Sequence, residues 1–470
     1  MVAGVAVRWL AAPLLAMAAA PSAAMAQASD AELKAEIADL KRVIATLQTR
    51  LDAVERAAGG QAPIATRSPI PEAPAVRKPT NSGPSAAASR LPQRETFGDE
   101  LTGVARLDNA PPPNDPELKG FIPIPGTETM IRLGGFAKVS AIYDTSPAGN
   151  PDKLVTSTIP IGAGGTNNAN LDANATRFSF EVRRPSSLGP LRFYLENDFY
   201  GGAGTTAFRL RQAHGQVGNT YAGYGYSAFT DSDAFPETLD DEGPGGEPLL
   251  RSAAIRQIWK VGDGLTATLS VEDPSSDLTL ASGMAAAQMA PDVVGAMRIE
   301  RPWGHVQASG VVRSIGYSYA GQDDSTLGYG LSLSGLIKLG GDFAMGSFTY
   351  GEGIARYFND LGGKGYDGVI GLDGDVRSLT AYGGYLGYTH HWSPRWRSSL
   401  VGGGVVLDRD NLLATTAFRS SAYGAFNLIW ALSPSFSMGV EALYGRHELQ
   451  DGRSADVTRL QASVKYDFVK

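Results

Sequence analysis

Residues 458–468 alternate between apolar and polar side chains, so that the two kinds fall on opposite faces of one extended segment. The apolar face consists of Leu460, Ala462, Val464, Tyr466 and Phe468. The polar face consists of Arg459, Gln461, Ser463, Lys465 and Asp467. Successive side chains of a β-strand point to opposite faces, so this segment is predicted to be a strand between an apolar medium and water. That medium could be a protein core or a lipid bilayer.

The same alternation begins near residue 129 and recurs to the end of the chain. In the first predicted strand, residues 129–144, the apolar side chains of Leu133, Val139 and Tyr143 oppose those of Lys138 and Ser140. Further segments with this pattern predict an all-β fold, an antiparallel barrel of about 16 transmembrane strands.

The connections between the predicted strands are alternately short and long. The short ones, rich in Pro and Gly, lie at residues 184–190, 218–219, 262–264, 301–303, 340–341, 392–394 and 432–434. The long ones span residues 145–173, 231–249, 274–291 and 357–377. Short turns at one rim and long loops at the other are typical of bacterial outer-membrane barrels. A soluble β-sandwich would need a second apolar layer, and the polar faces here are too charged to supply one.

Aromatic residues near the predicted strand ends also favour a bilayer. We expect them to form girdles at the two membrane interfaces. They are Tyr143, Tyr200, Tyr388, Tyr444 and Phe468.

Three further segments precede the predicted barrel, which occupies residues 128–470. Residues 1–26 are predicted to be a secretory signal, with Arg8 before an apolar run and Ala24-Met25-Ala26 as the cleavage site. Residues 27–57 are predicted to form a periplasmic α-helical coiled coil. Residues 58–127 are rich in Pro and Ala and are predicted to be an extended linker, because they cannot bury enough apolar surface to fold alone.

The coiled-coil prediction rests on apolar residues that recur at spacings of four and three. The seam consists of Leu33, Ile37, Leu40, Ile44, Leu47, Leu51 and Val54. Ile at a positions and Leu at d positions favour two strands. In contrast, the run from Arg50 to Glu55 resembles a pattern of three-stranded coils, and we expect a trimer. The alternative is an amphipathic helix that lies on its own domain.

Composition and motifs exclude several classes of protein. The formal net charge of −7 argues against a nucleic-acid binder. The absence of Cys excludes thiolate metal sites, Cys nucleophiles and disulfides. The five His residues form no zinc-binding motif, so no metal and no cofactor is expected. No hydrolase elbow or Walker loop is present, and a lipase-like Ser-His pair on the barrel wall would need His214 or His390 without any supporting motif.

Arginine is concentrated on the predicted inner faces of three neighbouring strands. The five residues are Arg177, Arg183, Arg192, Arg209 and Arg211. Guanidinium groups stay charged and bind carboxylates in a bidentate manner, so this wall is predicted to form a path for anions. Arg256 and Arg298, on later strands, could belong to the opposite wall. The alternative is a lattice of Arg and acidic residues that only braces the barrel, since Glu181, Glu196 and Asp198 lie on the same faces.

Residues 224–274 resemble the signature of the DcaP-like outer-membrane porins. The matching pieces are Tyr224-Gly225-Tyr226-Ser227-Ala228-Phe229-Thr230-Asp231, Pro236-Glu237-Thr238-Leu239-Asp240, Gly243-Pro244, Arg251, Ile255-Arg256 and Val271-Glu272-Asp273-Pro274. Gly135-Phe136-Ala137-Lys138 and Arg209-Leu210-Arg211 fit as well. This sequence departs from the family pattern at positions 224 and 226, where Tyr224 and Tyr226 stand in place of the expected Gln and Trp. In addition, Asp241 and Glu242 make the following loop more acidic.

This resemblance implies a signal peptide, a periplasmic coiled coil and a trimeric barrel that takes up small anions, including dicarboxylates. It also implies that residues 229–247 fold into the lumen as a constriction loop. Asp231, Asp233, Glu237 and Asp240 would then face the arginine wall across a narrow gap. The alternative is an external loop whose acidic residues stay hydrated.

We therefore expect an outer-membrane porin of a Gram-negative bacterium for passive diffusion of small hydrophilic solutes, with a preference for anions such as dicarboxylates. The expected partners are outer-membrane lipid and lipopolysaccharide, small anionic solutes and two further copies of the chain in a homotrimer. The alternative function is a structural or adhesive barrel that its coiled coil tethers to the periplasm.

Overall fold

The computed structural model describes residues 120–202 and 206–468 of the chain. The predicted signal peptide, coiled coil and most of the linker lie outside these residues. The end of the predicted linker forms a short strand, β1 (Ile122–Pro123), which pairs antiparallel with the start of β2 (Met130–Asp144). Within the described ranges, no helix has both the length and the apolar character needed to cross a membrane.

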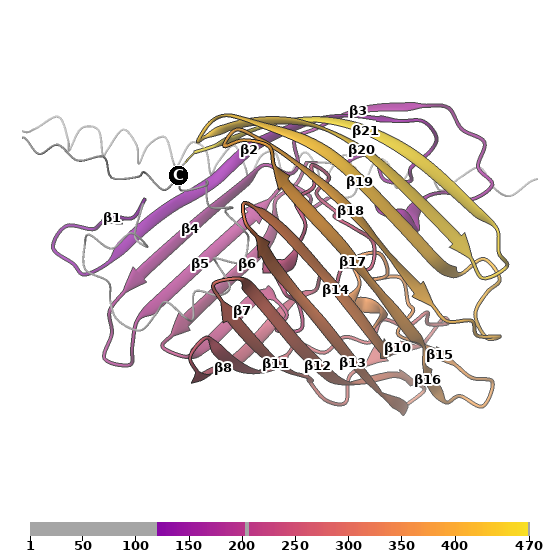
Figure 1. Ribbon diagram of the computed structural model, residues 1–470. Helices are drawn as coiled ribbons and strands as arrows, with labels where there is room; N and C mark the ends of the chain where they lie inside the picture. The colour runs from indigo at the N-terminus through magenta and orange to yellow at the C-terminus, as the bar shows by residue number, and fades with distance from the viewer. Residues whose placement is uncertain (1–119, 203–205, 469–470) are drawn as a thin grey trace, which may run out of the picture. The chain divides into compact units, whose positions relative to one another are not determined.

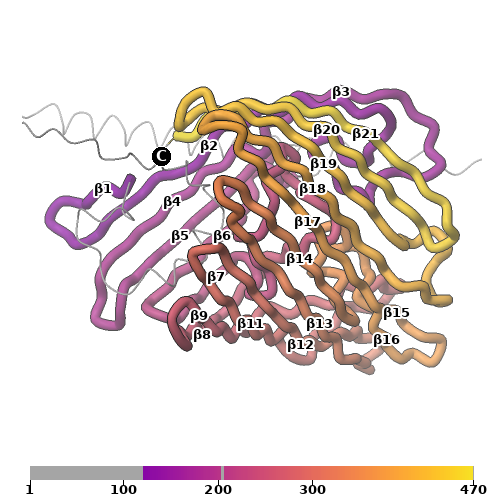
Figure 2. The backbone as a smooth tube through the Cα atoms, in the orientation of Figure 1, coloured from indigo at the N-terminus to yellow at the C-terminus, as the bar shows by residue number. Residues whose placement is uncertain are grey.

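The strands of the wall form a closed antiparallel barrel, and the predicted number of 16 strands is confirmed (Figures 1 and 2). After β2, the wall strands in order are β4 (Arg177–Arg184), β5 (Leu191–Asp198), β6 (Arg209–Val217), β7 (Thr220–Tyr226), β8 (Arg251–Gly262), β9 (Leu265–Glu272), β11 (Asp292–Arg301), β12 (Gly304–Tyr319), β13 (Gln322–Leu339), β14 (Asp342–Glu352), β17 (Thr380–His391), β18 (Trp396–Leu407), β19 (Phe418–Ser433), β20 (Phe436–Leu449) and β21 (Ser454–Asp467). The ring closes where β21 pairs with β2, from Phe136 opposite Asp467 to Asp144 opposite Arg459.

Short additional elements lie on the side of the long connections. These are β3 (Asn168–Asp172), β10 (Ala285–Ala287), the hairpin of β15 (Gly368–Ile370) and β16 (Val376–Ser378), and the 3-10 turns η4 (Thr156–Thr158), η5 (Ser232–Ala234) and η6 (Ala355–Tyr357). β3 continues the wall beside the upper half of β2, where β4 no longer reaches.

The alternation predicted for the last strand is confirmed. On β21 the apolar side chains of Leu460 and Tyr466 are 50% and 52% exposed, whereas Arg459 and Gln461 are 0% and 4% exposed. The apolar face therefore points outward and the polar face points into the barrel. Tyr143, Tyr388, Tyr444 and Phe468 are exposed on the outer surface as expected of girdle residues. Tyr200 differs, because its hydroxyl donates a hydrogen bond to Asp172 inside the barrel.

A buried ion pair joins the last strand to the first. Arg459 Nε and Nη2 donate to the two carboxylate oxygens of Asp144, at 2.7 and 3.0 Å, and both side chains are almost fully buried. Ser140 and Ser463 add a hydroxyl contact at 2.8 Å across the same strand pair. The closing seam is thus held by side chains as well as by the backbone ladder.

Among the long connections that pack inside the barrel, two concern the functional site. In residues 227–250, between β7 and β8, the carbonyl oxygens of Phe229 and Ala234 accept hydrogen bonds from Ser309 and Tyr385 of the wall. In residues 353–379, between β14 and β17, five hydrophobic residues from Ile354 to Leu361 have no exposed area. We call these segments the constriction loop and the plug loop.

Apolar packing fills part of the interior beside β11, β12 and β17–β19, contrary to the open bore that the polar inner faces suggested. The plug-loop side chains and Phe229 contact inward-facing residues of these strands. The cluster comprises Ala228, Phe229, Val294, Val311, Ile354, Ala355, Tyr357, Phe358, Leu361, Leu379, Ala381, Val405, Leu407 and Phe418. The physical reason is that apolar residues of the loops find apolar partners on the wall, and their burial stabilises the inward position of both loops.

A run of glycines on β18 allows the constriction loop to approach the wall closely. Gly246 has a φ of +81°, and a Cβ atom there would lie 2.2 Å from the carbonyl oxygen of Gly404. A Cβ atom on Gly403 would lie 2.6 Å from the carbonyl oxygen of Gly245. Side chains at these positions would therefore displace the loop into the lumen.

Arg313 on β12 holds the plug loop from below. Its guanidinium is fully buried, lies 2.7 Å from Asp367 of the plug loop and 3.3 Å from Asp292 of β11, and donates to the carbonyl oxygen of Gly353 at 2.7 Å. Removal of one partner from a buried ion pair leaves an uncompensated charge.

We expect Arg313→Met to destabilise the docked plug loop by about 3 kcal/mol, because two buried carboxylates lose their common partner. The measurement is protection of plug-loop amides from hydrogen exchange in the detergent-solubilised barrel. Arg377→Gln is the matched control in the same loop, since its ion pair with Asp373 is about half exposed and screened by solvent, so its loss should leave protection nearly unchanged. Equal loss of protection in the two variants would contradict this role of Arg313.

Candidate functional site

Three arginines near the upper ends of β4 and β6, the ends toward the long connections, share two carboxylates of β5. Arg209 Nε and Nη2 lie 2.8 and 2.5 Å from Asp198, and Arg211 contacts both Glu196 and Asp198, at 2.6 and 2.8 Å. Arg177 lies 3.7 Å from Glu196. We call this group the upper cluster. It carries one more positive than negative charge.

A second group, the lower cluster, lies toward the short turns. Arg132 of β2, Arg183 of β4 and Arg192 of β5 contact the carboxylate of Glu181 at 2.6, 2.8 and 2.7 Å. Phe121 lies against it, with the guanidinium carbons of Arg132 and Arg183 at 5.1 and 5.2 Å from its ring centroid. Three guanidinium groups share one carboxylate here, so the lower cluster has a surplus of two positive charges.

Aromatic rings hold several of the guanidinium planes on this wall. Arg192 lies 5.1 Å from the ring centroid of Tyr194, and Arg256 lies 4.6 Å from that of Tyr221. Stacking of a guanidinium on an aromatic face is favourable and restricts its rotation. Arg192 and Arg256 are therefore fixed in orientation as well as in position.

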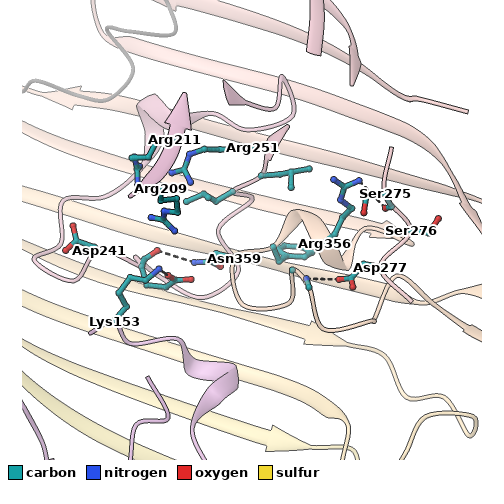
Figure 3. Close-up of a pocket in the computed structure, with 16 residues that line it drawn as sticks. Lys153, Arg209, Arg211, Asp241, Arg251, Ser275, Ser276, Asp277, Arg356 and Asn359 are labelled. Carbon is teal, nitrogen blue, oxygen red and sulfur yellow. Dashed lines mark hydrogen bonds and ion pairs between the residues drawn. The ribbon is translucent and has the colours of Figure 1, made fainter. Parts of the chain in front are cut away.

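A polar cavity of about 420 Å³ separates the upper cluster from the inward loops. Figure 3 shows Arg209, Arg211 and Arg251 grouped on one side of this cavity, with Lys153 and Asp241 facing them. The remaining lining includes Glu242, Ser275, Ser276, Asp277, Arg356, Phe358 and Asn359. Carboxylates and cations thus face one another across the cavity, and Phe358 of the apolar cluster also lines it.

The acidic residues of the constriction loop have their own partners on the wall. Asp231 contacts Arg298, His305 and Ser334 at 3.0, 3.0 and 2.7 Å, and Asp233 contacts Arg298 at 2.6 Å. Burial acts to raise the pKa of Asp231, but the hydrogen bond from His305 and the charge of Arg298 outweigh it and hold the pKa below its usual value.

The second half of the constriction loop is anchored on β18 and β20. Glu237 forms a bidentate pair with Arg397, at 2.7 and 2.6 Å. The backbone N–H of Asp240 donates to Glu441 at 2.8 Å, and one carboxylate oxygen of Asp240 accepts from the N–H of Leu154 at 3.0 Å. Burial raises the pKa of Asp240 to about 7.

These contacts differ from the expectation that Asp231, Asp233, Glu237 and Asp240 face the arginines of β4–β6. The loop lies against the wall from β11 to β20, and buried carboxylates require partners where they are desolvated. Asp241 and Glu242, which made the loop more acidic than the family pattern, line the cavity instead and pair with Lys138 and Lys153.

The seven arginines named from the sequence all lie on the inner surface but do not form one row. Arg177, Arg209 and Arg211 belong to the upper cluster, and Arg183 and Arg192 to the lower one. Arg256 lies 3.6 Å from Glu272, and Arg298 holds the constriction loop. Arg256 and Arg298 share a second cavity of about 110 Å³ beneath that loop.

Sequence reasoning missed several cationic residues of the site. The alternation of β2 already assigns Arg132 to the polar face, so its position was available from the pattern. Arg251 stands at the first position of β8 and occurs in the family signature, which offered a weaker signal. Lys153 and Arg356 lie in long connections, where no periodicity indicates direction.

The arrangement supports electrostatic recognition of solutes rather than covalent chemistry. Residues 120–202 and 206–468 contain no group of three or more His, Asp or Glu side chains placed to hold a metal ion.

Comparison with solved structures shows that a bacterial outer-membrane channel has the same fold. The outer-membrane channel DcaP of Acinetobacter baumannii is 22% identical, with a TM-score of 0.67, and the match covers 75% of this chain and 100% of that one. A loop L8 deletion mutant of OmpT of Vibrio cholerae is 8% identical, with a TM-score of 0.47 and coverage of 73% and 100%. An anion-selective porin from Comamonas acidovorans is 13% identical, with a TM-score of 0.47 and coverage of 73% and 100%. No curated protein gives a significant match.

The family comparison covers the whole described barrel. Residues 119–469 match the model of the porin subfamily. The chain therefore belongs to the porin subfamily, and it is an outer-membrane β-barrel channel protein rather than an enzyme.

Proposed function

We propose that this porin allows passive diffusion of small hydrophilic solutes across the outer membrane and favours anions such as dicarboxylates. The observation that carries this proposal is the surplus of positive charge in the upper and lower clusters. Glu181, Glu196 and Asp198 compensate only part of the charge of the six arginines in these clusters. Rings and patches of charge in a narrow pore set the preference for ions of one sign.

The same acidic residues brace the wall, so the bracing role and the anion path are compatible. A guanidinium carries five N–H donors, and a single carboxylate shared by three arginines cannot accept from all of them. Arg132 of the lower cluster is about one third exposed, so its guanidinium is within reach of a solute. The partial burial of the clusters increases the strength of such interactions relative to bulk water.

The position of the apolar cluster supports a path along the arginine wall. Plug-loop residues and Phe229 fill the interior beside β11, β12 and β17–β19. Water and polar solutes avoid such surfaces, so permeation is directed to the cavity beside Arg209 and Arg211. The constriction loop has the role of narrowing this route from the side opposite β4–β6.

The proposal includes a homotrimer embedded among outer-membrane lipid and lipopolysaccharide, with the N-terminal coil in the periplasm. Its support is the seam pattern of residues 27–57. The mass of the detergent-solubilised protein with and without these residues tests the contribution of the coil, and a monomer in both preparations would contradict the trimer.

Planar-bilayer recordings test the central claim. We expect ohmic conductance in symmetric KCl and an anion-selective reversal potential in a salt gradient. Arg183→Gln with Arg192→Gln should lower the ratio of anion to cation permeability by about threefold, because the surplus charge of the lower cluster is removed within a Debye length of the path.

The matched control for this variant removes the same two charges at the same rim but outside the bore. Arg301→Gln with Arg395→Gln does so, since both residues are exposed and lie at the short turns. Its selectivity should equal that of the wild type. A cation-selective wild type would contradict the anion path, and absence of conductance would favour the structural or adhesive barrel.

We expect the seating of the constriction loop to weaken as pH rises from about 4 to about 7. Burial raises the pKa of Asp240 to about 7, whereas a solvated Asp titrates near its ordinary value. Between these pH values the carboxyl group of Asp240 stays protonated in the seated loop but loses its proton in an unseated loop. The free energy that favours the seated loop therefore decreases with rising pH, until Asp240 also ionises in the seated loop. Arg459, Glu441 and Glu242 are the charged groups that surround it.

Closure events in single-channel records as a function of pH measure this dependence. Asp240→Asn should abolish it, because the amide stays neutral, whereas Asp263→Asn in an exposed turn should leave it unchanged. Persistence of the full pH dependence in Asp240→Asn would show that another group is responsible.

A further inference from the structure

Arg251 differs from the other cationic residues of the large cavity in the use of its donors. Arg209 gives Nε and Nη2 to Asp198, and Arg211 gives Nε and Nη1 to Glu196 and Asp198. These nitrogens are therefore already occupied by carboxylates of the wall.

The two cations contributed by the loops also have acidic partners. Lys153 Nζ lies 2.5 Å from Glu242. Arg356 Nη1 lies 3.5 Å from Asp292 and donates to the carbonyl oxygen of Ser275 at 3.1 Å. Each of these charges is compensated within the protein.

Arg251 forms no ion pair with any carboxylate in residues 120–202 and 206–468. Its Nη2 donates to the hydroxyl of Tyr226 at 3.0 Å, and its guanidinium carbon lies 4.6 Å from the ring centroid of the same residue. Its Nε is buried and has no hydrogen-bond partner in the structure. Arg251 thus brings to the cavity a charge that is not paired with a carboxylate.

One acidic residue, Glu247, interacts electrostatically with Arg251 without forming an ion pair with it. Glu247, in the constriction loop, is 3% exposed. Burial raises the pKa of Glu247 well above its ordinary value, and the negative charge of Glu242 raises it further. Burial therefore disfavours the carboxylate form of Glu247, although the charge of Arg251 acts in the opposite direction on its pKa.

We propose that Arg251 is the residue that binds the oxyanion group of a passing solute, in a cavity that accepts one carboxylate at a time. This inference rests on the proposed anion-favouring function and assigns its binding step to one side chain. The one charge of Arg251, which has no carboxylate partner of its own, fits a single carboxylate, and the cavity of about 420 Å³ has room for a small organic acid. Bidentate contact with the free edge of the guanidinium supplies the recognition.

Tyr226 is the positioning residue for Arg251. Its hydroxyl oxygen lies 3.0 Å from Nη2 of Arg251 and 3.2 Å from Nη2 of Arg211, so it accepts from both guanidinium groups. The Tyr226 hydroxyl oxygen thus holds two positively charged guanidinium groups next to each other. The indole N–H of the Trp that the family pattern suggests at this position is a donor only and could not serve in this way. The Tyr at position 226 is therefore coupled to the binding role of Arg251.

The test is the concentration dependence of single-channel conductance in potassium acetate, which saturates when the anion binds in the pore. Arg251→Gln should raise the half-saturating acetate concentration by about tenfold, the loss expected for a charge-assisted bidentate contact. Tyr226→Phe should raise it by about threefold, because the guanidinium loses its fixed orientation without a change in charge.

Arg209→Gln is the matched control, since it lines the same cavity and removes the same formal charge but has both Nε and Nη2 occupied by Asp198. It should raise the half-saturating concentration by less than about threefold. Arg251→Lys, which keeps the charge, should lie between wild type and Arg251→Gln. If Arg251→Gln does not assemble, Arg251→Lys and Tyr226→Phe still decide the matter.

Equal effects of Arg251→Gln and Arg209→Gln would overturn this assignment, because net charge alone would then explain the binding. So would conductance of the wild type that rises with acetate without saturation. A wild type that selects cations in KCl would instead contradict the proposed function, so the two failures are distinguishable.

Discussion

Every backbone N–H and C=O group in the hydrocarbon region of a bilayer must find its partner within the protein, because the lipid offers none. The pairing of β21 with β2 meets this requirement for the two strands that would otherwise be edges. Arg459 and Asp144 reinforce the same pair with a buried bidentate contact. All later features, including the direction of every wall side chain, depend on this closure.

Because the barrel is closed, the charged side chains on its inner face need partners within the protein. Charged side chains turned into the barrel are partly desolvated, and each of the five inward-facing arginines of β4–β6 contacts at least one acidic residue. The number of arginines exceeds that of the carboxylates, so the wall keeps a positive surplus after its internal pairs are formed. The network of ion pairs that stabilises the wall therefore also supports the proposed preference for anions.

The inward loops divide the interior into two unlike halves. On one side, Tyr357 and Phe358 pack with Val405 and other apolar residues of the wall. On the other, the upper cluster faces Asp241 and Glu242 across the cavity. In the proposed function, this division directs solutes to the arginine side. It also explains the glycines of β18, because Gly403 and Gly404 let the constriction loop lie flat against the wall.

The amino-acid sequence by itself determined the barrel. The alternation of apolar and polar residues and the alternation of short and long connections are local properties of the chain, and both can be recognised without any tertiary contact. The sequence also placed Arg183 and Arg192 on the inner face. Only the tertiary structure decided which charges are left uncompensated. Arg251 and Arg209 look alike in the sequence, and the difference between them arises from the position of Asp198 on a neighbouring strand and from the burial of Glu247. Likewise, Asp231 and Glu237 turn to Arg298 and Arg397 because the long loop folds back onto distant strands, and no local pattern specifies that path.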